Sequence, residues 1–478
     1  MYIGLSILAL VVAFLAVVIV RTLGFKPRVS QEGEISEEIF DRDKAIASLG
    51  ELVKCKTVSR ATHEEEDEAE FEKLYALLPT LYPNVHATCE LVRFEDRGLL
   101  YRFRGKTEGK PSVLMAHFDV VPVREELWEK PPFDAVIEYG HMWGRGTLDT
   151  KVTFNGILSA AETLIIQGFV PENDIYMAFS GGEEVNGKGA LHIVNYFKEK
   201  GIELSMVVDE GGAVVENVFP GVKKPSAMVG IAEKGMLNLK YKVSSNGGHA
   251  SAPKPHTPVG LLSRACTRVE NHPFPSHVTK PVADMFDTLG RHSTFVYRMI
   301  FANLWCFKGV LDLLAKKSGG EMNALMRTTV AFTQMAGSDA PNVIPPSAEM
   351  VSNIRLNPKD TMESAMAYIQ KTIGDERVEL EAVGGMNPSR ISVTDCDGYR
   401  RVERAIAATW QGCIVTPYLM VQCSDCRHYG AISDKVYHFS AMDLTSEERA
   451  TIHGNNEKIR LETVGKAVEF FLRLMRQC

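Results

Sequence analysis

Two adjacent carboxylates follow an apolar run in the first half of the chain. The run Ile175 to Phe179 is typical of a buried strand, and a glycine turn separates it from Glu183 and Glu184. Two carboxylates in such a turn can bind a metal ion and act as a general base beside it. On these residues alone, the alternative is an acidic pair that only faces solvent.

Further segments place a histidine or an acid at the end of an apolar run or after a glycine turn. His117 and Asp119 end one run, Asp209 ends another, and Asp149 follows a glycine turn. A metal-bound imidazole commonly donates its second N–H to a carboxylate, a role open to Asp119. The alternatives are a histidine satisfied by a loop and an Asp149 that only caps a helix. His453 lies in a predicted loop and is, taken alone, an ordinary loop residue.

Alternating strand-like and helix-like segments predict an α/β fold with a mostly parallel sheet. The carboxyl ends of parallel strands meet at one edge of such a sheet, so the acids and the histidine are expected to gather there. Four or five neighbouring carboxylates repel one another unless a cation compensates. Mixed histidine and carboxylate ligands suit zinc, with cobalt or manganese as alternatives.

Taken together, these segments resemble the dinuclear zinc metallopeptidase family that includes aminoacylase, carnosinase, carboxypeptidase G and succinyl-diaminopimelate desuccinylase. Within that family the carboxypeptidase S-like branch, which includes N-acyl-amino-acid hydrolases, is the most similar. The matching segments, in chain order, are His117 to Pro122, Gly144 to Lys151, Gly182-Glu183-Glu184, Asp209-Glu210-Gly211 and Ile452 to Glu457.

The resemblance implies a phosphorylase/hydrolase-like catalytic domain with two zinc ions. Asp149 is expected to bridge the ions, with His117 and Asp209 completing one site and Glu184 and His453 the other. The resemblance also implies further roles, with Asp119 supporting His117, Glu183 as the general base, His249 as an oxyanion donor that sometimes reaches a partner subunit's site, and Asn342, Arg355 and Arg427 as substrate-binding residues.

The segment order β, α, β, β, α, β over residues 235–383 predicts a ferredoxin-like α+β domain. It is inserted between two parts of the catalytic domain, residues 41–234 and 384–478. The resemblance implies that this insert is a lid or dimerisation domain, and hence a homodimer. Residues 280–327 are rich in large apolar side chains; a core helix pair is expected, with an apolar substrate wall or a membrane-facing surface as alternatives.

The first 20 residues carry no charged side chain. As a helix they would span about 30 Å, the thickness of the hydrocarbon core of a bilayer. They lack the basic start and short apolar core of a cleaved signal peptide. We therefore predict a single-pass membrane anchor over residues 1–22 and a polar linker over residues 23–40. The flanking positive charges favour a cytoplasmic catalytic part, whereas the resemblance leaves a secreted or luminal placement open.

The composition is that of a globular protein. The chain has 478 residues, of which 45% are hydrophobic and 24% charged, and a net charge of -7 with acids and bases interspersed. No basic face is indicated, so nucleic acid is not an expected partner. Nine scattered cysteines predict no disulfide framework, and the Cys423-Ser424-Asp425-Cys426 motif is interpreted as structural.

These residues predict hydrolysis of an amide bond in an N-acyl amino acid or a short peptide with a free carboxylate. A di- or tripeptidase of the same family is the enzymatic alternative. The non-enzymatic alternative is a membrane-tethered binding protein on an inactive hydrolase fold.

Overall fold

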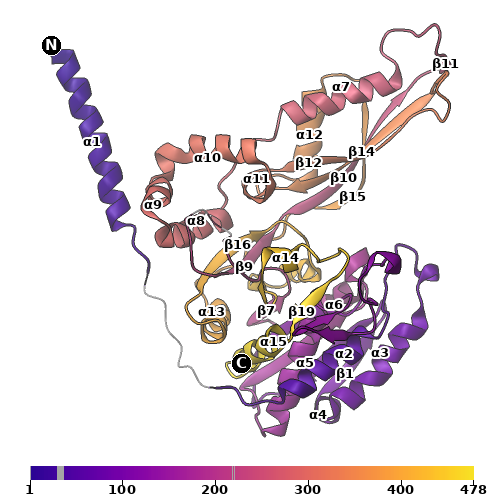
Figure 1. Ribbon diagram of the computed structural model, residues 1–478, viewed down its shortest axis with the longest axis vertical. Coiled ribbons are helices and arrows are strands. Elements are labelled where there is room, and N and C mark those ends of the chain that lie inside the picture. The colour runs from indigo at the N-terminus through magenta and orange to yellow at the C-terminus, as the bar shows by residue number, and fades with distance from the viewer. Residues whose placement is uncertain (1, 29–36, 218, 220) are drawn as a thin grey trace.

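Two large β-sheets organise the chain, one in the catalytic part and one in the insert (Figure 1). The computed structural model describes residues 2–28, 37–217, 219 and 221–478. Within these residues the larger sheet has ten strands in the order β1-β2-β6-β3-β7-β17-β9-β8-β18, with β16 beside β9. Its strands are β1 (Glu90–Phe94), β2 (Gly98–Phe103), β3 (Thr107–His117), β6 (Asn173–Ser180), β7 (Met206–Asp209), β8 (Val214–Val215), β9 (Ser226–Glu233), β16 (Ile414–Met420), β17 (Val436–His438) and β18 (Asp443–Leu444).

This sheet is mixed: the predicted parallel pairing holds at its centre and for the pairs β8–β18 and β9–β16, whereas other pairs are antiparallel. Strand β3 runs parallel to β6 and β7, and β17 runs parallel to β7. Strands β1 and β2 pair antiparallel, as do β2 and β6 and also β8 and β9. The turn between β1 and β2 is too short for a helical crossover, and antiparallel pairing is what such a connection allows.

Helices cover both faces of the large sheet, which explains its uninterrupted apolar strands. In β6, Ile175, Met177 and Phe179 belong to one hydrophobic core, and Tyr176 and Ala178 belong to a second core on the opposite face. The first core is covered by α2 (Arg42–Val53), α3 (Glu68–Leu81), α4 (Pro83–Thr88), α5 (Lys151–Ile166), α13 (Asp397–Thr409) and α15 (Leu461–Met475), and the second by α6 (Gly189–Glu199).

The second sheet is antiparallel and has its own hydrophobic core. Its strand order is β12-β14-β10-β15, and α7 and α12 contribute buried side chains to its core. A short ribbon of β11 and β13 extends from its outer end (Figure 1). The elements are β10 (Gly235–Ser244), β11 (Gly248–His249), α7 (Pro258–Asn271), β12 (Thr329–Ala336), β13 (Val343–Ile344), β14 (Ser347–Leu356), α12 (Met362–Ile373) and β15 (Glu379–Met386).

Four helices connect α7 to β12. They are α8 (Lys280–His292), α9 (Phe295–Ala302), α10 (Leu304–Ser318) and α11 (Gly320–Met326). The expected core role is met by α8, whose Val282, Met285, Phe286 and Leu289 are fully buried in the larger core. The outer faces of α9 and α10 remain exposed.

The N-terminal helix α1 (Tyr2–Gly24) is long and apolar enough to cross a membrane, a test that a signal sequence near the N-terminus also passes. Only Val18 and Thr22 of this helix are buried. Most of α1 projects away from the catalytic part (Figure 1). Part of the predicted linker, residues 29–36, lies outside the described residues.

Candidate active site

Three neighbouring strands bring the predicted site segments to one edge of the large sheet. Strands β6, β3 and β7 lie side by side and run parallel. His117 is the last residue of β3, Asp209 is the last residue of β7, and Glu183 follows β6 after a short turn. The prediction that these strand ends meet is confirmed.

Asp149 lies at the centre of the cluster and faces two histidines. Its Oδ1 is 3.0 Å from His117 Nε2, and its Oδ2 is 3.0 Å from His453 Nε2. Burial alone would raise the pKa of Asp149, but the two histidine contacts outweigh it and lower this pKa. One carboxylate that presents a separate oxygen to each histidine is suited to bridging two cations.

Two glutamates complete the cluster on either side of Asp149. Glu184 Oε2 is 3.1 Å from His453 Nε2, and Glu210 Oε1 is 3.3 Å from His117 Nε2. Two ligand atoms each about 2 Å from one zinc ion stand roughly 3.3 Å apart at a tetrahedral angle, so these spacings fit a metal ion.

The unbalanced charge and the unpaired atoms of the cluster also fit bound cations. Glu184 Oε1 is buried and has no hydrogen-bond partner among the described residues. Burial raises the pKa of Glu210 to about 8, and the negative charge of Asp149 adds to this rise. A buried carboxylate oxygen without a donor is costly unless a cation binds it. The donor set therefore suits a pair of metal ions.

Asp209, predicted as a ligand beside His117, makes its hydrogen bonds outside this cluster, and Glu210 is the acid of this segment that lies beside His117. The Oδ2 atom of Asp209 accepts hydrogen bonds from Ser424 Oγ at 3.1 Å and from the Cys426 amide at 3.0 Å. Successive side chains along a strand point to opposite faces, so adjacent acids at the end of β7 cannot both reach His117.

Asp119 supports two parts of the cluster at once. Its carboxylate accepts hydrogen bonds from the backbone amides of Glu183 at 3.1 Å and Glu184 at 3.2 Å, and from Ser59 Oγ at 2.6 Å. Its backbone carbonyl lies 3.0 Å from His117 Nδ1. A proton on Nδ1 donates to that carbonyl and leaves the Nε2 lone pair free for a metal.

Glu457 ends the last of the segments that match the family, and no role was predicted for it. It is fully buried, and its Oε1 accepts hydrogen bonds from the amides of Leu148 at 2.7 Å and Asp149 at 3.3 Å. Its Oε2 pairs with Arg145 Nη1 at 2.6 Å. Glu457 thereby fixes the loop that presents Asp149, and the match of its segment to the family was the available signal.

A cavity of about 640 Å³ opens over the cluster, and Glu183 lies in its wall. Asp149, Glu184, Glu210 and His453 line the same cavity. Burial raises the pKa of Glu183 well above its usual range; His117 opposes this rise, whereas Glu210 and other acids add to it. Glu183 therefore places a carboxyl group next to the space where a substrate would bind.

A second group of possible ligands lies behind Asp209. Glu233, Cys426 and His438 are buried and close together. Cys426 Sγ is 3.3 Å from Nδ1 and 3.7 Å from Nε2 of His438. Such similar distances place the sulfur over the ring face, whereas a ligand nitrogen needs the metal in the ring plane. This group is a packed polar network around Ser424, in keeping with the structural interpretation of the Cys423–Cys426 motif.

His249 and Asn342 lie together at the β11–β13 ribbon and not at the cluster. His249 is exposed, and its Nδ1 is 2.8 Å from Ser251 Oγ. The Asn342 carbonyl accepts a hydrogen bond from the Ala250 amide at 3.0 Å. Neither is among the described residues that line the cavity. Figure 1 shows this ribbon at the end of the second sheet that points away from the large sheet.

The two predicted substrate-binding arginines lie nearer to the cluster. Arg355 on β14 places Nη1 3.5 Å from the sulfur of Cys423, a residue that lines the cavity. Arg427 donates from Nη2 to Asn186 Oδ1 at 3.1 Å, in the loop that follows Glu183 and Glu184. Each arginine contacts a residue next to the predicted site, but neither is among the described residues that line the cavity.

A sheet edge that combines two histidines, a shared aspartate and flanking glutamates under a cavity defines a metal-dependent hydrolase. Residues 113–477 match the sequence profile of the peptidase family M20/M25/M40. The chain belongs to this family, and it is a hydrolase that acts on amide C–N bonds.

Full-length relatives support the family assignment. The chain is 33% identical over 479 residues to the N-fatty-acyl-amino acid synthase/hydrolase PM20D1 of Xenopus tropicalis, covering 97% of this chain and 93% of that protein. It is 31% identical over 482 residues to the probable carboxypeptidase S-like 2 of Dictyostelium discoideum, covering 98% and 92%. The fold is similar to that of the M20 family metallo-carboxypeptidase Sso-CP2 from Sulfolobus solfataricus, with a TM-score of 0.66 and 17% identity over 91% of this chain and 98% of that one.

Proposed function

We propose that this chain is a dizinc hydrolase that cleaves the amide bond of N-acyl amino acids. The observation that supports this proposal most directly is Asp149, whose two oxygens face His117 and His453 separately. In this assignment His117, Asp149 and Glu210 hold one ion, and Glu184, Asp149 and His453 hold the other. When bound, the two ions lower the pKa of a water molecule and polarise the amide carbonyl.

Glu183 is the residue proposed to move the proton. The proposed assignment gives Glu183 neither ion; its carboxylate lines the cavity close to His117 and Glu210, where it can accept a proton from water. It then donates that proton to the leaving amine, so that the same carboxyl group acts first as a general base and then as a general acid. Asp119 keeps Glu183 in position through the hydrogen bond from the Glu183 amide.

The walls of the cavity support an acylated substrate with a free carboxylate. Arg355 and Arg427 are the proposed carboxylate-binding residues, because a guanidinium pairs with a carboxylate through a planar fork. Apolar side chains line the same cavity and can pack against an acyl chain; they include Val215, Met228, Met420, Met442 and Leu444. The relative from Xenopus tropicalis carries N-fatty-acyl-amino acids in its name, which favours the same substrate class.

We propose that the second sheet acts as a dimerisation domain and that His249 and Asn342 serve the active site of a second copy. Both residues lie at an exposed ribbon remote from the cavity of their own chain. An imidazole at the substrate carbonyl would stabilise the oxyanion that forms there.

We further propose that α1 anchors the chain in a membrane. The helix is uncharged over its first 19 residues, and 6% of its most apolar window is buried inside the protein. Exposed apolar side chains over such a length are stable in a bilayer and costly in water.

The test is a hydrolysis screen on purified full-length protein. We expect N-lauroyl and N-acetyl amino acids to be cleaved faster than unblocked dipeptides, and we expect a chelator to abolish the activity and zinc to restore it. Faster cleavage of unblocked dipeptides would favour a di- or tripeptidase. Absence of both zinc and hydrolysis would favour a binding protein instead.

A further inference from the structure

Large apolar side chains gather on the outer faces of α9 and α10. Outside α1, exposed side chains of this kind elsewhere in the described chain are spread over many elements, with one or two on each. Contiguous exposed apolar surface of this kind marks a site of contact with another apolar phase. The exposed residues are Phe295, Val296 and Tyr297 on α9 and Trp305, Val310, Leu313 and Leu314 on α10. We call this set the α9–α10 face.

The C-terminal half of α1 packs against the junction between α9 and α10, next to this face. Arg21 Nη2 donates to the Ala302 carbonyl at 3.1 Å, and Asn303 Nδ2 donates to the Val18 carbonyl at 3.2 Å. Further along α1, the rings of Phe14 and Trp305 meet edge to face at 5.7 Å. The N-terminal helix is therefore fixed to the corner between α9 and α10.

The position of these contacts along α1 determines how deep they would lie in a bilayer that α1 spans. Phe14 precedes the last residue of the helix, Gly24, by ten positions. At a rise of about 1.5 Å per residue this corresponds to roughly 15 Å along the axis, about half the hydrocarbon thickness of a bilayer. If α1 spans a membrane, Trp305, which contacts Phe14, must lie among the acyl chains.

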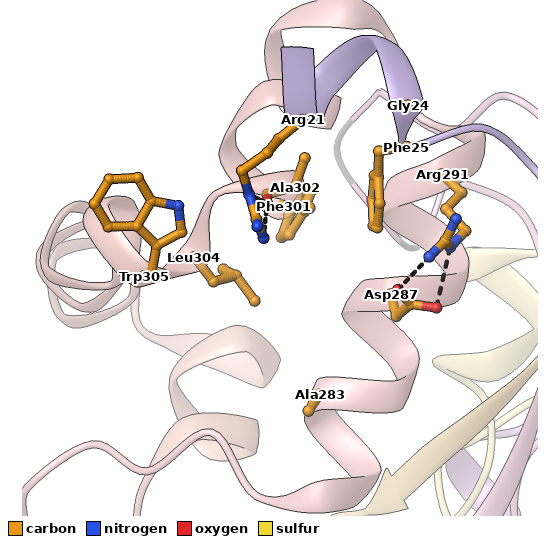
Figure 2. A pocket seen from close by; sticks show the side chains of 10 residues that line it. All are labelled: Arg21, Gly24, Phe25, Ala283, Asp287, Arg291, Phe301, Ala302, Leu304 and Trp305. Carbon is orange, nitrogen blue, oxygen red and sulfur yellow. Dashed lines mark hydrogen bonds and ion pairs between the residues drawn. The ribbon is translucent and has the colours of Figure 1, made fainter. Parts of the chain in front are cut away.

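Charged groups lie close to the C-terminal end of α1. Asp287 on α8 pairs with Arg28 at 2.8 Å and with Arg291 at 2.8 Å. Figure 2 shows Arg21, Asp287 and Arg291 around an open space of about 490 Å³, with Phe301 and Trp305 on its apolar side. Charged side chains therefore gather where α1 ends, as is typical of the headgroup level of a bilayer.

We infer that the α9–α10 face is embedded in the lipid bilayer together with α1, as one continuous lipid-facing surface. This inference rests on the proposed anchoring by α1. Lys308 and Lys317, which are exposed on α10, have stems long enough to carry their charges to the interface. Helix α10 leads into α11, whose Gly320, Glu321 and Ala324 line the active-site cavity. The catalytic cavity therefore lies next to the membrane surface.

The test uses full-length protein in phosphatidylcholine vesicles with plain or dibrominated acyl chains. Bromine quenches tryptophan only at close range, and Trp305 is an exposed tryptophan on this face. We expect brominated lipid to reduce the fluorescence of the unmodified protein and to have no such effect on Trp305→Phe. In the Trp305→Phe background, Leu313→Trp should restore the quenching, whereas Tyr139→Trp, on an exposed turn of the catalytic part, should not.

The outcomes separate the inference from the proposals on which it stands. Protein that floats with the vesicles but shows equal fluorescence in both lipids, with Trp305 accessible to aqueous iodide, would overturn the embedded face and leave the anchor intact. Protein that does not float would overturn the anchor and the embedded face together. Hydrolysis is measured on the same samples and is expected to be unchanged, because none of the substituted residues lines the cavity.

Discussion

The cluster at the sheet edge and the β11–β13 ribbon differ in how completely one chain builds them. At the sheet edge, His117, Asp149 and Glu184 are held by contacts from separate segments, and Asp119 and Glu457 beneath them are fully buried. At the ribbon, predicted active-site residues are exposed and contact only their neighbours. The acids and histidines of the cluster come together within one chain, whereas the ribbon residues do not reach it, and this contrast is the basis of our proposal that a second copy supplies the oxyanion donor.

The largest expected effect on kcat comes from removing the proposed general base at the sheet edge while the metal ligands stay in place. Glu183→Ala should lower kcat by about 10,000-fold, the upper range for a lost general base. Metal content should stay at the level of the unmodified protein, because the proposed assignment gives Glu183 no ion although it lies close to His117 and Glu210. Steady-state hydrolysis and elemental analysis on the same sample check both parts. Exposed Glu126→Ala is the control, and near-normal turnover by Glu183→Ala would refute its role as base.

The next effect distinguishes two adjacent acids at the end of β7. Glu210→Gln should remove a direct ligand and lower bound zinc from two ions towards one per chain. Asp209→Asn should weaken zinc binding by about 10-fold to 100-fold, as expected of a residue that acts through a neighbouring element. Zinc titration of the two variants measures this order. A larger loss in Asp209→Asn would return Asp209 to the ligand set.

A smaller effect is expected at the ribbon. His249→Ala should lower kcat by about 100-fold through the loss of an oxyanion donor. Co-expression with Glu183→Ala should then restore activity, because a mixed dimer has one site that combines an intact Glu183 with an intact His249. Each variant expressed alone is the control. Absence of restoration in verified mixed dimers would place His249 in the site of its own chain.

The smallest expected effect is on stability and comes from Lys234 at the junction between the two sheets. Lys234 lies between β9 and β10, and its Nζ donates to the carbonyls of Ala324 and Arg327 at 2.8 Å each. Burial lowers the pKa of Lys234 from 10.5 to about 7, and the charge of Arg355 adds to this effect.

The sign of the expected pH dependence follows from that shift. Between these two pKa values the unfolded chain binds more protons at this position than the folded one. Stability should therefore rise with pH, by up to about 1.4 kcal/mol per pH unit. Thermal unfolding at pH 7 and pH 9 should show this rise in the unmodified protein and a smaller one in Lys234→Met. An equal change of stability with pH in both proteins would refute the lowered pKa of Lys234.

How far the sequence predicts the site depends on which physical rule decides each residue. The meeting of His117 and Glu184 was predictable because parallel strands bring their carboxyl ends to one edge, and the approach of Asp149 rested on the match of its glycine turn to the family. Which of Asp209 and Glu210 faces His117 was not predictable, because it depends on which way side chains point at the residue where the strand ends. The antiparallel strands of the large sheet also escaped prediction. For residues 280–327 the sequence left a core helix pair, a substrate wall and a membrane-facing surface open, since apolar patterning alone does not distinguish a core from a lipid-facing surface.

The role of Glu457 shows a different limit. Its contacts join the loop of Asp149 to a segment about three hundred residues later in the chain. Such a pairing follows from tertiary structure and has no local signature beyond the match of its motif to the family.

The most direct test of the central claim is a zinc titration of the metal-free protein with hydrolysis of an N-acyl amino acid measured at each point. The account predicts no activity without metal and activity that reaches its maximum as the chain binds two zinc ions. Full activity of a verified metal-free protein, or saturation at two ions without hydrolysis of any N-acyl amino acid or peptide, would contradict it.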